Sequence, residues 1–138
     1  MTNHIEKREA KHQEKYEFEN QLKSRFNKLY SDTDGKYLNE VNRAQFDGAI
    51  TDDEKTEFDE YVSNKYQDVL AEYEYVDNEL EKYPVDKTVS PREFMNTDNY
   101  WKSRLIKDYR FNITVNFYRI NNLYAKVFGM LYVKINIK

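Results

Sequence analysis

The stretch from Thr51 to Tyr83 contains neither glycine nor proline, and this constrains the fold more than any other feature of the sequence. Thr51 and Glu54 match a capping box, the pattern that begins many helices, and two aspartates lie between them at the positive end of the helix dipole. A helix of about 32 residues would be about 48 Å long. The whole chain has only 3 Gly and 2 Pro, which predicts long elements joined by few turns. We therefore expect a predominantly helical protein built around this long acidic helix.

The same stretch carries an apolar seam with the spacing of a heptad repeat. The seam consists of Val62, Tyr66, Val69, Tyr73, Val76, Leu80 and Tyr83. Valine can be buried completely, whereas the tyrosine hydroxyl needs water or a polar partner, so we expect the tyrosine hydroxyls at a wet margin. Tyrosine is also enriched at protein interfaces, which predicts a partner-binding set. That set is Tyr61, Tyr66, Tyr73 and Tyr75. The alternative is that these tyrosines only cover a thin core.

A second helix is predicted over residues 3–30, and its two halves differ. The segment is almost entirely polar up to Lys15, after which Phe18, Leu22, Phe26 and Leu29 form an apolar stripe. We expect the second half to pack on the protein and the first half to project or to lie along a partner. A turn at 31–36 and a short helix at 37–46 follow.

The C-terminal part changes from a helical period to alternation, which predicts strands. Phe111, Ile113, Val115 and Phe117 alternate with polar residues, and Asn121-Asn122 suits a two-residue hairpin loop because Asn tolerates positive φ. The predicted class is therefore α+β, in one domain over 1–138. Its parts are a helical region at 1–83, a linker at 84–96, and a helix with an antiparallel β-hairpin at 97–138.

The last predicted strand lacks cover. Val133, Ile135 and Ile137 extend beyond the first strand of the hairpin and lie on its opposite face. A strand that is apolar on both faces needs packing on both sides, and its edge offers unpaired N–H and C=O groups. This predicts a homo-oligomer whose subunits meet through the strand. The alternative is cover by another strand or by the N-terminal helix of the same chain.

Charge is distributed unevenly along the chain. Residues 31–86 carry a net charge of −12 and residues 87–138 carry +7. The simplest interpretation is that the two parts pack together, and the alternatives are head-to-tail self-association or a polyanion site. Within the basic part, basic and aromatic side chains interleave at 100–111, as in sites for single-stranded nucleic acid. These are Tyr100, Trp101, Lys102, Arg104, Lys107 and Arg110. Their helical spacing also allows the aromatic members to be ordinary core.

No catalytic, cofactor or metal site is predicted. The chain has no cysteine, which excludes disulfides and thiolate chemistry. His4 and His12 are too far apart for a zinc pair on one helix, and no further ligands accompany them. The stretch around Gly48 resembles part of a calcium loop, but Arg43 and Gln45 stand where carboxylates are needed. A small-molecule substrate is therefore not expected.

These observations predict a non-enzymatic protein-interaction or assembly protein that binds another protein or itself. Abundant Asn, Lys, Tyr, Phe and Ile suggest an AT-rich genome, and we associate the chain with a phage or mobile element. The alternatives are a small acidic inhibitor of a host nucleic-acid-handling protein and a single-strand-binding protein. No apolar run reaches the roughly 20 residues of a membrane span, and no signal peptide is expected. The expected location is the host cytoplasm or a virion.

Overall fold

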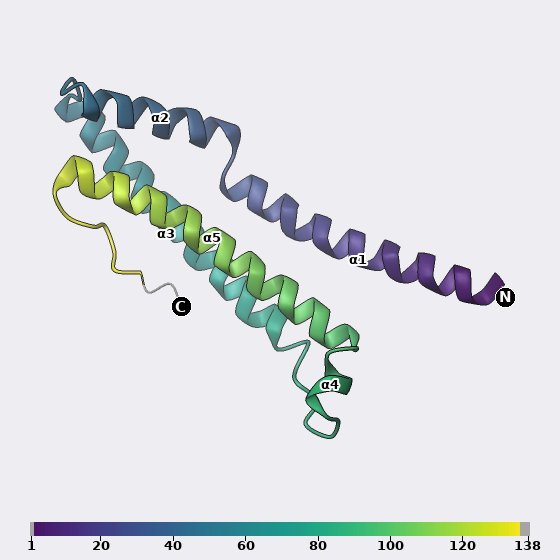
Figure 1. Cartoon of the computed structure of the whole chain (residues 1–138). Helices are drawn as coiled ribbons and strands as arrows, with labels where there is room; N and C mark the ends of the chain where they lie inside the picture. The colour runs from purple at the N-terminus through teal and green to yellow at the C-terminus, as the bar shows by residue number, and fades with distance from the viewer. Residues whose placement is uncertain (1, 136–138) are drawn as a thin grey trace.

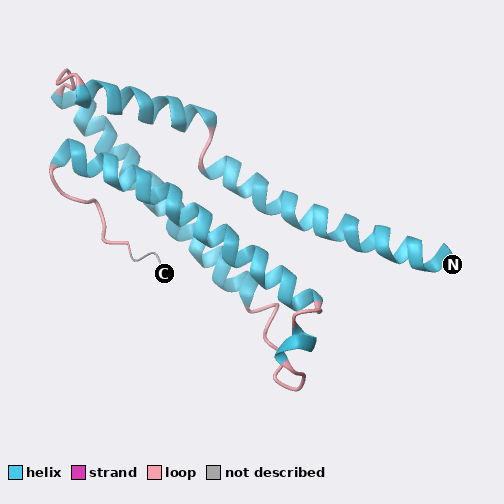
Figure 2. Cartoon of the chain, viewed as in Figure 1, coloured by secondary structure: helices cyan, strands magenta, loops and turns pink. Residues whose placement is uncertain are grey.

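A computed structural model describes residues 2–135 of the chain, and the ordered elements in that range are all helical (Figures 1 and 2). The helices are α1 (Thr2–Leu29), α2 (Asp32–Phe46), α3 (Asp52–Leu80), α4 (Pro91–Phe94) and α5 (Asp98–Phe128). The long helices α3 and α5 run antiparallel and form the most extensive contact in the molecule. α1 and α2 form a bent arm alongside α5. None of these helices combines the length and the apolarity needed to cross a membrane.

The expected α+β class and C-terminal β-hairpin are wrong, because residues 98–128 form the single helix α5 and no strand occurs among the described residues. The alternation was ambiguous because Ile113 and Phe117 are four residues apart and therefore fit both periods. Phe111, which the hairpin would have buried beside them, is 52% exposed. The buried side chains of α5 recur every three or four residues, as a helix requires. They include Ile106, Tyr109, Ile113, Phe117, Ile120, Tyr124 and Val127.

Asn121, expected in a hairpin loop, is buried in the C-terminal part of α5 and binds the chain's own C-terminal segment, residues 130–135. Its Nδ2 donates to the carbonyl oxygen of Val133 at 2.6 Å, and its Oδ1 accepts from the backbone N–H of Tyr132 at 2.7 Å. Gly129 ends α5 with a φ of 79°, a conformation that suits glycine. The chain therefore turns back at Gly129, and the segment lies against the helices instead of forming a strand.

Side-chain caps fix where the helices begin. The predicted capping box of α3 is confirmed, since the Thr51 hydroxyl accepts from the Glu54 N–H at 3.1 Å and the Glu54 carboxylate accepts from the Thr51 N–H at 3.1 Å. The turn predicted at 31–36 is wrong, because Ser31 and Asp34 form a second capping box there. α2 therefore begins directly after Ser31, and the expected short helix at 37–46 is only its last two thirds.

The core lies mainly between α3 and α5. Val62, Val69 and Val76 of the predicted seam are buried, as expected. The acidic helix thus packs on the basic one, and Arg110 of α5 pairs with Asp77 of α3 at 3.5 Å. This arrangement agrees with the simplest interpretation of the uneven charge, in which the two parts neutralise each other.

α1 divides into two halves as predicted. Leu22 and Leu29 in its second half are buried, whereas every residue from 4 to 17 is exposed. Figure 1 shows this N-terminal half extending beyond the ends of α3 and α5. We call residues 4–17 the projecting half of α1.

Candidate functional site

A groove runs between α5 and the arm that α1 and α2 form. One cavity of about 370 Å³ lies between α1 and α5, and a second of about 550 Å³ lies between α5 and the α1–α2 bend. Phe26 lines both cavities, and we call the two cavities together the docking groove. Its α5 wall extends from Leu105 to Lys126, which is about 31 Å of helix.

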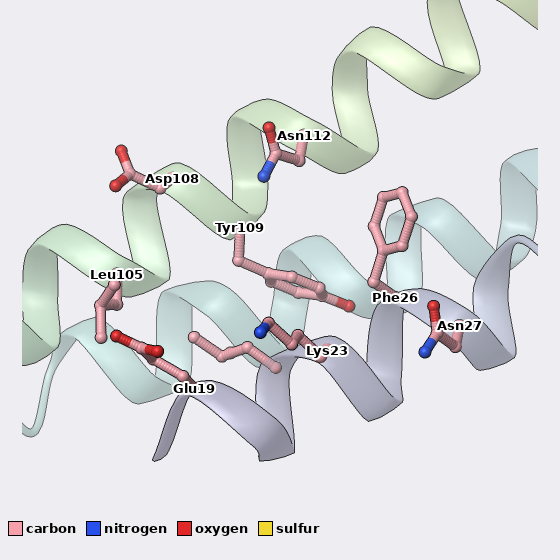
Figure 3. A pocket seen from close by; sticks show the side chains of 9 residues that line it. Glu19, Lys23, Phe26, Asn27, Leu105, Asp108, Tyr109 and Asn112 are labelled. Atoms are coloured by element: carbon pink, nitrogen blue, oxygen red, sulfur yellow. The ribbon is translucent and has the colours of Figure 1, made fainter. Parts of the chain in front are cut away.

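The α1 end of the docking groove has an apolar floor between polar rims. Figure 3 shows Leu105 and Tyr109 pointing from α5 toward α1, while Phe26 points back toward α5. Leu22 completes the floor. The rims are formed by Glu19, Lys23 and Asn27 on α1 and by Asp108 and Asn112 on α5. An apolar floor with polar edges is the form of site that receives an amphipathic helix.

The α2 end of the docking groove is more polar. Its floor includes Leu38 and Leu123. Amide side chains dominate its edges, and each amide offers both donors and acceptors to a bound chain. The edge residues include Asn39, Asn42, Asn116, Asn122, Arg119 and Lys126.

A charged network fixes α1 against the α3–α5 pair beneath the docking groove. Arg25 of α1 donates from Nε and Nη2 to the two carboxylate oxygens of Glu72, at 2.9 Å each, and its guanidinium lies 3.5 Å from the centre of the Tyr75 ring. Tyr109 donates its hydroxyl to the same carboxylate. Burial and this hydrogen bond raise the pKa of Tyr109, so the hydroxyl stays protonated and remains a donor.

A second network holds the bend between α1 and α2. Lys65 of α3 donates to the carbonyl oxygen of Leu29 at 2.6 Å and pairs with Asp34 at 3.1 Å. Tyr61 donates to the same carboxylate at 2.6 Å. Burial alone would raise the pKa of Asp34, but hydrogen bonds from Tyr61, Ser31 and Lys65 outweigh it and lower the pKa to about 2. One ammonium therefore contacts the end of α1 and the start of α2, and so sets the direction of the arm.

The four tyrosines of the predicted partner-binding set contact the chain's own residues. Tyr61 and Tyr75 belong to the two networks described above. Tyr66 packs its ring 5.5 Å from that of Phe117, and the Tyr73 hydroxyl is 2.5 Å from a threonine hydroxyl of α5. These hydroxyls and rings therefore have internal neighbours, and a role in partner binding stays a prediction.

The predicted inter-subunit strand is not formed in the described part of the C-terminus. Val133 and Ile135 are partly buried against the core of their own chain. The Tyr132 ring packs between those of Tyr66 and Tyr124, at 5.7 and 5.3 Å. Ile137 lies outside the described residues. The segment packs on α3 and α5 of its own chain. The expectation that subunits meet here depended on an uncovered apolar strand, so it no longer holds.

The basic and aromatic residues at the start of α5 face different neighbours. The Trp101 ring lies 5.5 Å from Phe18, and its indole N–H donates to Asp98 at 3.0 Å. Lys102 pairs with Glu14 of α1 at 2.8 Å. These contacts attach α1 to α5 and leave neither the indole nor this ammonium directed at a common outer surface.

The remaining members of that set are similarly dispersed. Arg104 donates to the Tyr100 hydroxyl at 3.2 Å, while Arg110 lies 4.8 Å from the centre of the Tyr73 ring. Lys107 is exposed. Nucleic-acid binding by these residues stays a prediction, and the helix does not stack them into one platform.

His4 and His12 are both exposed on the projecting half of α1. Within residues 2–135, no three His, Asp or Glu side chains are grouped so that they could hold a metal ion.

The docking groove was not predicted, because the part of its α5 wall beyond Tyr109 lies in the segment interpreted as a hairpin. The signal was present in the spacing of Asn112, Asn116 and Arg119, which continues the three- and four-residue steps of Leu105 and Asp108. No protein-family model, curated protein or solved structure matches the chain.

Proposed function

We propose that this chain is a non-enzymatic protein-interaction protein that holds an amphipathic helix of a protein partner in the docking groove. The observation that carries the proposal is the apolar floor of Leu22, Phe26, Leu105 and Tyr109 between two polar rims. A helix about 10 Å wide would lie beside α1 and α5 and place its apolar stripe on this floor. Its polar face would remain in contact with water and with the rims.

The walls of the groove support such binding because they are held before a partner arrives. The Arg25–Glu72 pair attaches α1 to α3, and the Lys65–Asp34 pair fixes the bend of the arm. A preorganised groove loses less conformational freedom on binding than a mobile one. We place this activity in the cytoplasm, because a chain without cysteine gains nothing from an oxidising compartment.

Position-specific photo-crosslinking tests the proposal. One variant carries p-benzoylphenylalanine at Asn112, on the rim of the docking groove, and its control carries it at Gln67, an exposed position on α3. After irradiation in an extract of the source cells, we expect protein adducts from position 112 and none from position 67. Equal yields from both positions, or adducts from neither, would overturn the proposal.

The two other functions expected from the sequence gain no specific support. The outer face of α3 exposes Glu57, Glu60 and Glu74, but exposed carboxylates also occur on ordinary solvated helices. The residues expected to bind single strands make the dispersed internal contacts described above. Inhibition of a nucleic-acid-handling protein and single-strand binding therefore stay predictions.

A further inference from the structure

We infer that the partner in the docking groove is a second copy of this chain, which inserts the projecting half of its α1 antiparallel to the α1 that lines the groove. This inference rests on the proposed function, because it names the occupant of the same groove. Each copy would receive the other's projecting half, so the contact would be two-fold symmetric and closed.

The face of α1 that lines the docking groove continues into the projecting half. Glu19, Lys23 and Phe26 line the groove. The same three- and four-residue steps lead toward the N-terminus through Tyr16, His12, Glu9 and Ile5. Glu9, His12, Tyr16 and Glu19 line a shallow depression on α1, and Glu19 also lines the first cavity of the docking groove. One face of α1 therefore forms a wall of the docking groove in its C-terminal half. The same face continues along the projecting half, where it could pack on the corresponding face of a second copy.

The projecting half carries apolar side chains that a single copy leaves uncovered. Ile5 is 59% exposed and Tyr16 is 61% exposed, although both lie on this face. Antiparallel pairing about an axis near Tyr16 would stack Tyr16 on its symmetry mate. Ile5 would then reach the apolar floor beside Phe26, where the docking groove has its first cavity.

The same alignment brings opposite charges together. On this face each residue lies opposite the residue of the other copy that is equally far from Tyr16, so Glu9 of one copy meets Lys23 of the other. Both side chains are exposed in the single chain, and symmetry makes the pair twice. Residues 4–17 hold four basic and four acidic side chains, so two projecting halves approach without net repulsion.

The lengths also agree. The projecting half is about 20 Å long, and the part of α1 that packs on α5 is of similar length. At that end of the molecule α1 and α5 line the apolar floor, and the partner's helix would pack across both of them.

Charge reversal provides a test that does not depend on loss of folding. Glu9→Lys alone and Lys23→Glu alone each place like charges opposite one another at both symmetric pairs. Mixing the two variants restores both pairs in a heterodimer. The control, Lys7→Glu, changes the charge as Lys23→Glu does, but lies on the opposite face of α1.

Sedimentation equilibrium measures the mass, and the chain mass is 16.8 kDa. We expect twice this mass for the wild type and for the control Lys7→Glu. Glu9→Lys alone and Lys23→Glu alone should each give the chain mass, and their mixture should give twice the chain mass. A wild type that stays at 16.8 kDa, or a mixture that stays monomeric, would overturn the inference. If the wild type is monomeric while position 112 still cross-links specifically to another protein, only this inference fails. If position 112 gives no specific adduct at all, the proposed function fails with it.

Discussion

Replacing Lys65 by methionine should destabilise the protein through the bend between α1 and α2. Methionine keeps most of the side-chain volume but removes the ammonium that contacts Leu29 and Asp34. The Leu29 carbonyl at the end of α1 then loses a charge-assisted hydrogen bond, which contributes about 1.5–3 kcal/mol. The Asp34 side chain, only 14% exposed, loses its counter-ion.

Removing one partner of a buried ion pair costs about 3–5 kcal/mol. Asp34 keeps the Tyr61 and Ser31 hydroxyls as donors, so we expect a loss near the lower end, about 3 kcal/mol. Urea unfolding followed by circular dichroism measures the change. Lys36→Met, an exposed change of the same chemistry on α2, serves as the control and should alter stability by less than about 0.5 kcal/mol.

A double-mutant cycle separates the ion pair from general packing effects. Asp34→Asn combined with Lys65→Met leaves no unpaired charge, so the combined loss should be smaller than the sum of the two single losses by at least about 1 kcal/mol. The reasoning would be refuted if Lys65→Met stays within about 0.5 kcal/mol of the wild type. Strict additivity of the two changes would refute it equally.

Two further predictions concern acid stability and the C-terminal segment. Because the folded-state pKa of Asp34 is lowered to about 2, the stability that its ionised form contributes is present above about pH 4 and is lost as pH falls toward 2, by at most about 2 kcal/mol. The stability difference between wild type and Asp34→Asn, measured by urea unfolding, should shrink over this range, and a difference independent of pH would contradict the assignment. The backbone N–H groups of Tyr132 and Val133 both donate to Asn121 Oδ1, at 2.7 and 3.3 Å. Asn121→Ala should therefore release the C-terminal segment, lower stability by about 1–3 kcal/mol and speed amide hydrogen exchange at these two residues. Unchanged exchange at these two amides would show that Asn121 does not hold the segment.

Local signals were sufficient to predict the long helices before residue 84. The capping box at Thr51 and the absence of breakers specified α3, and the apolar stripe from Phe18 to Leu29 separated the two halves of α1. These features depend on neighbours within one or two turns. They can therefore be read without knowing what lies across the fold.

The C-terminal part could not be predicted in the same way, because its conformation depends on contacts with distant segments. A residue such as Ile113 favours strands, but packing against the valine seam of α3 overrides that preference. Asn121 has a turn former's side chain, yet its hydrogen-bond partners lie 11 and 12 residues further along. The docking groove was not predicted, because the part of its α5 wall beyond Tyr109 was interpreted as strands.

Tyrosine partners were unpredictable for a related reason. The hydroxyl of Tyr61 meets Asp34 of α2, and that of Tyr109 meets Glu72 of α3. A tyrosine's own segment shows that its hydroxyl needs a partner, but the partner's identity depends on how the helices cross. Part of the surface expected to bind other proteins therefore became the polar interior of this one.

The unequal contacts among the helices imply an order of assembly during folding. α3 and α5 are neighbours in the chain, apart from the short α4 region, and share the largest interface, so they can pair after closing a modest loop. α1 and α2 make smaller contacts with this helical pair and would join it late in folding. They would also detach before α3 and α5 separate in native-state fluctuations. Two copies could then exchange α1 while α3 and α5 of each copy stay packed together. The exchange of one dimer partner for another therefore does not require global unfolding.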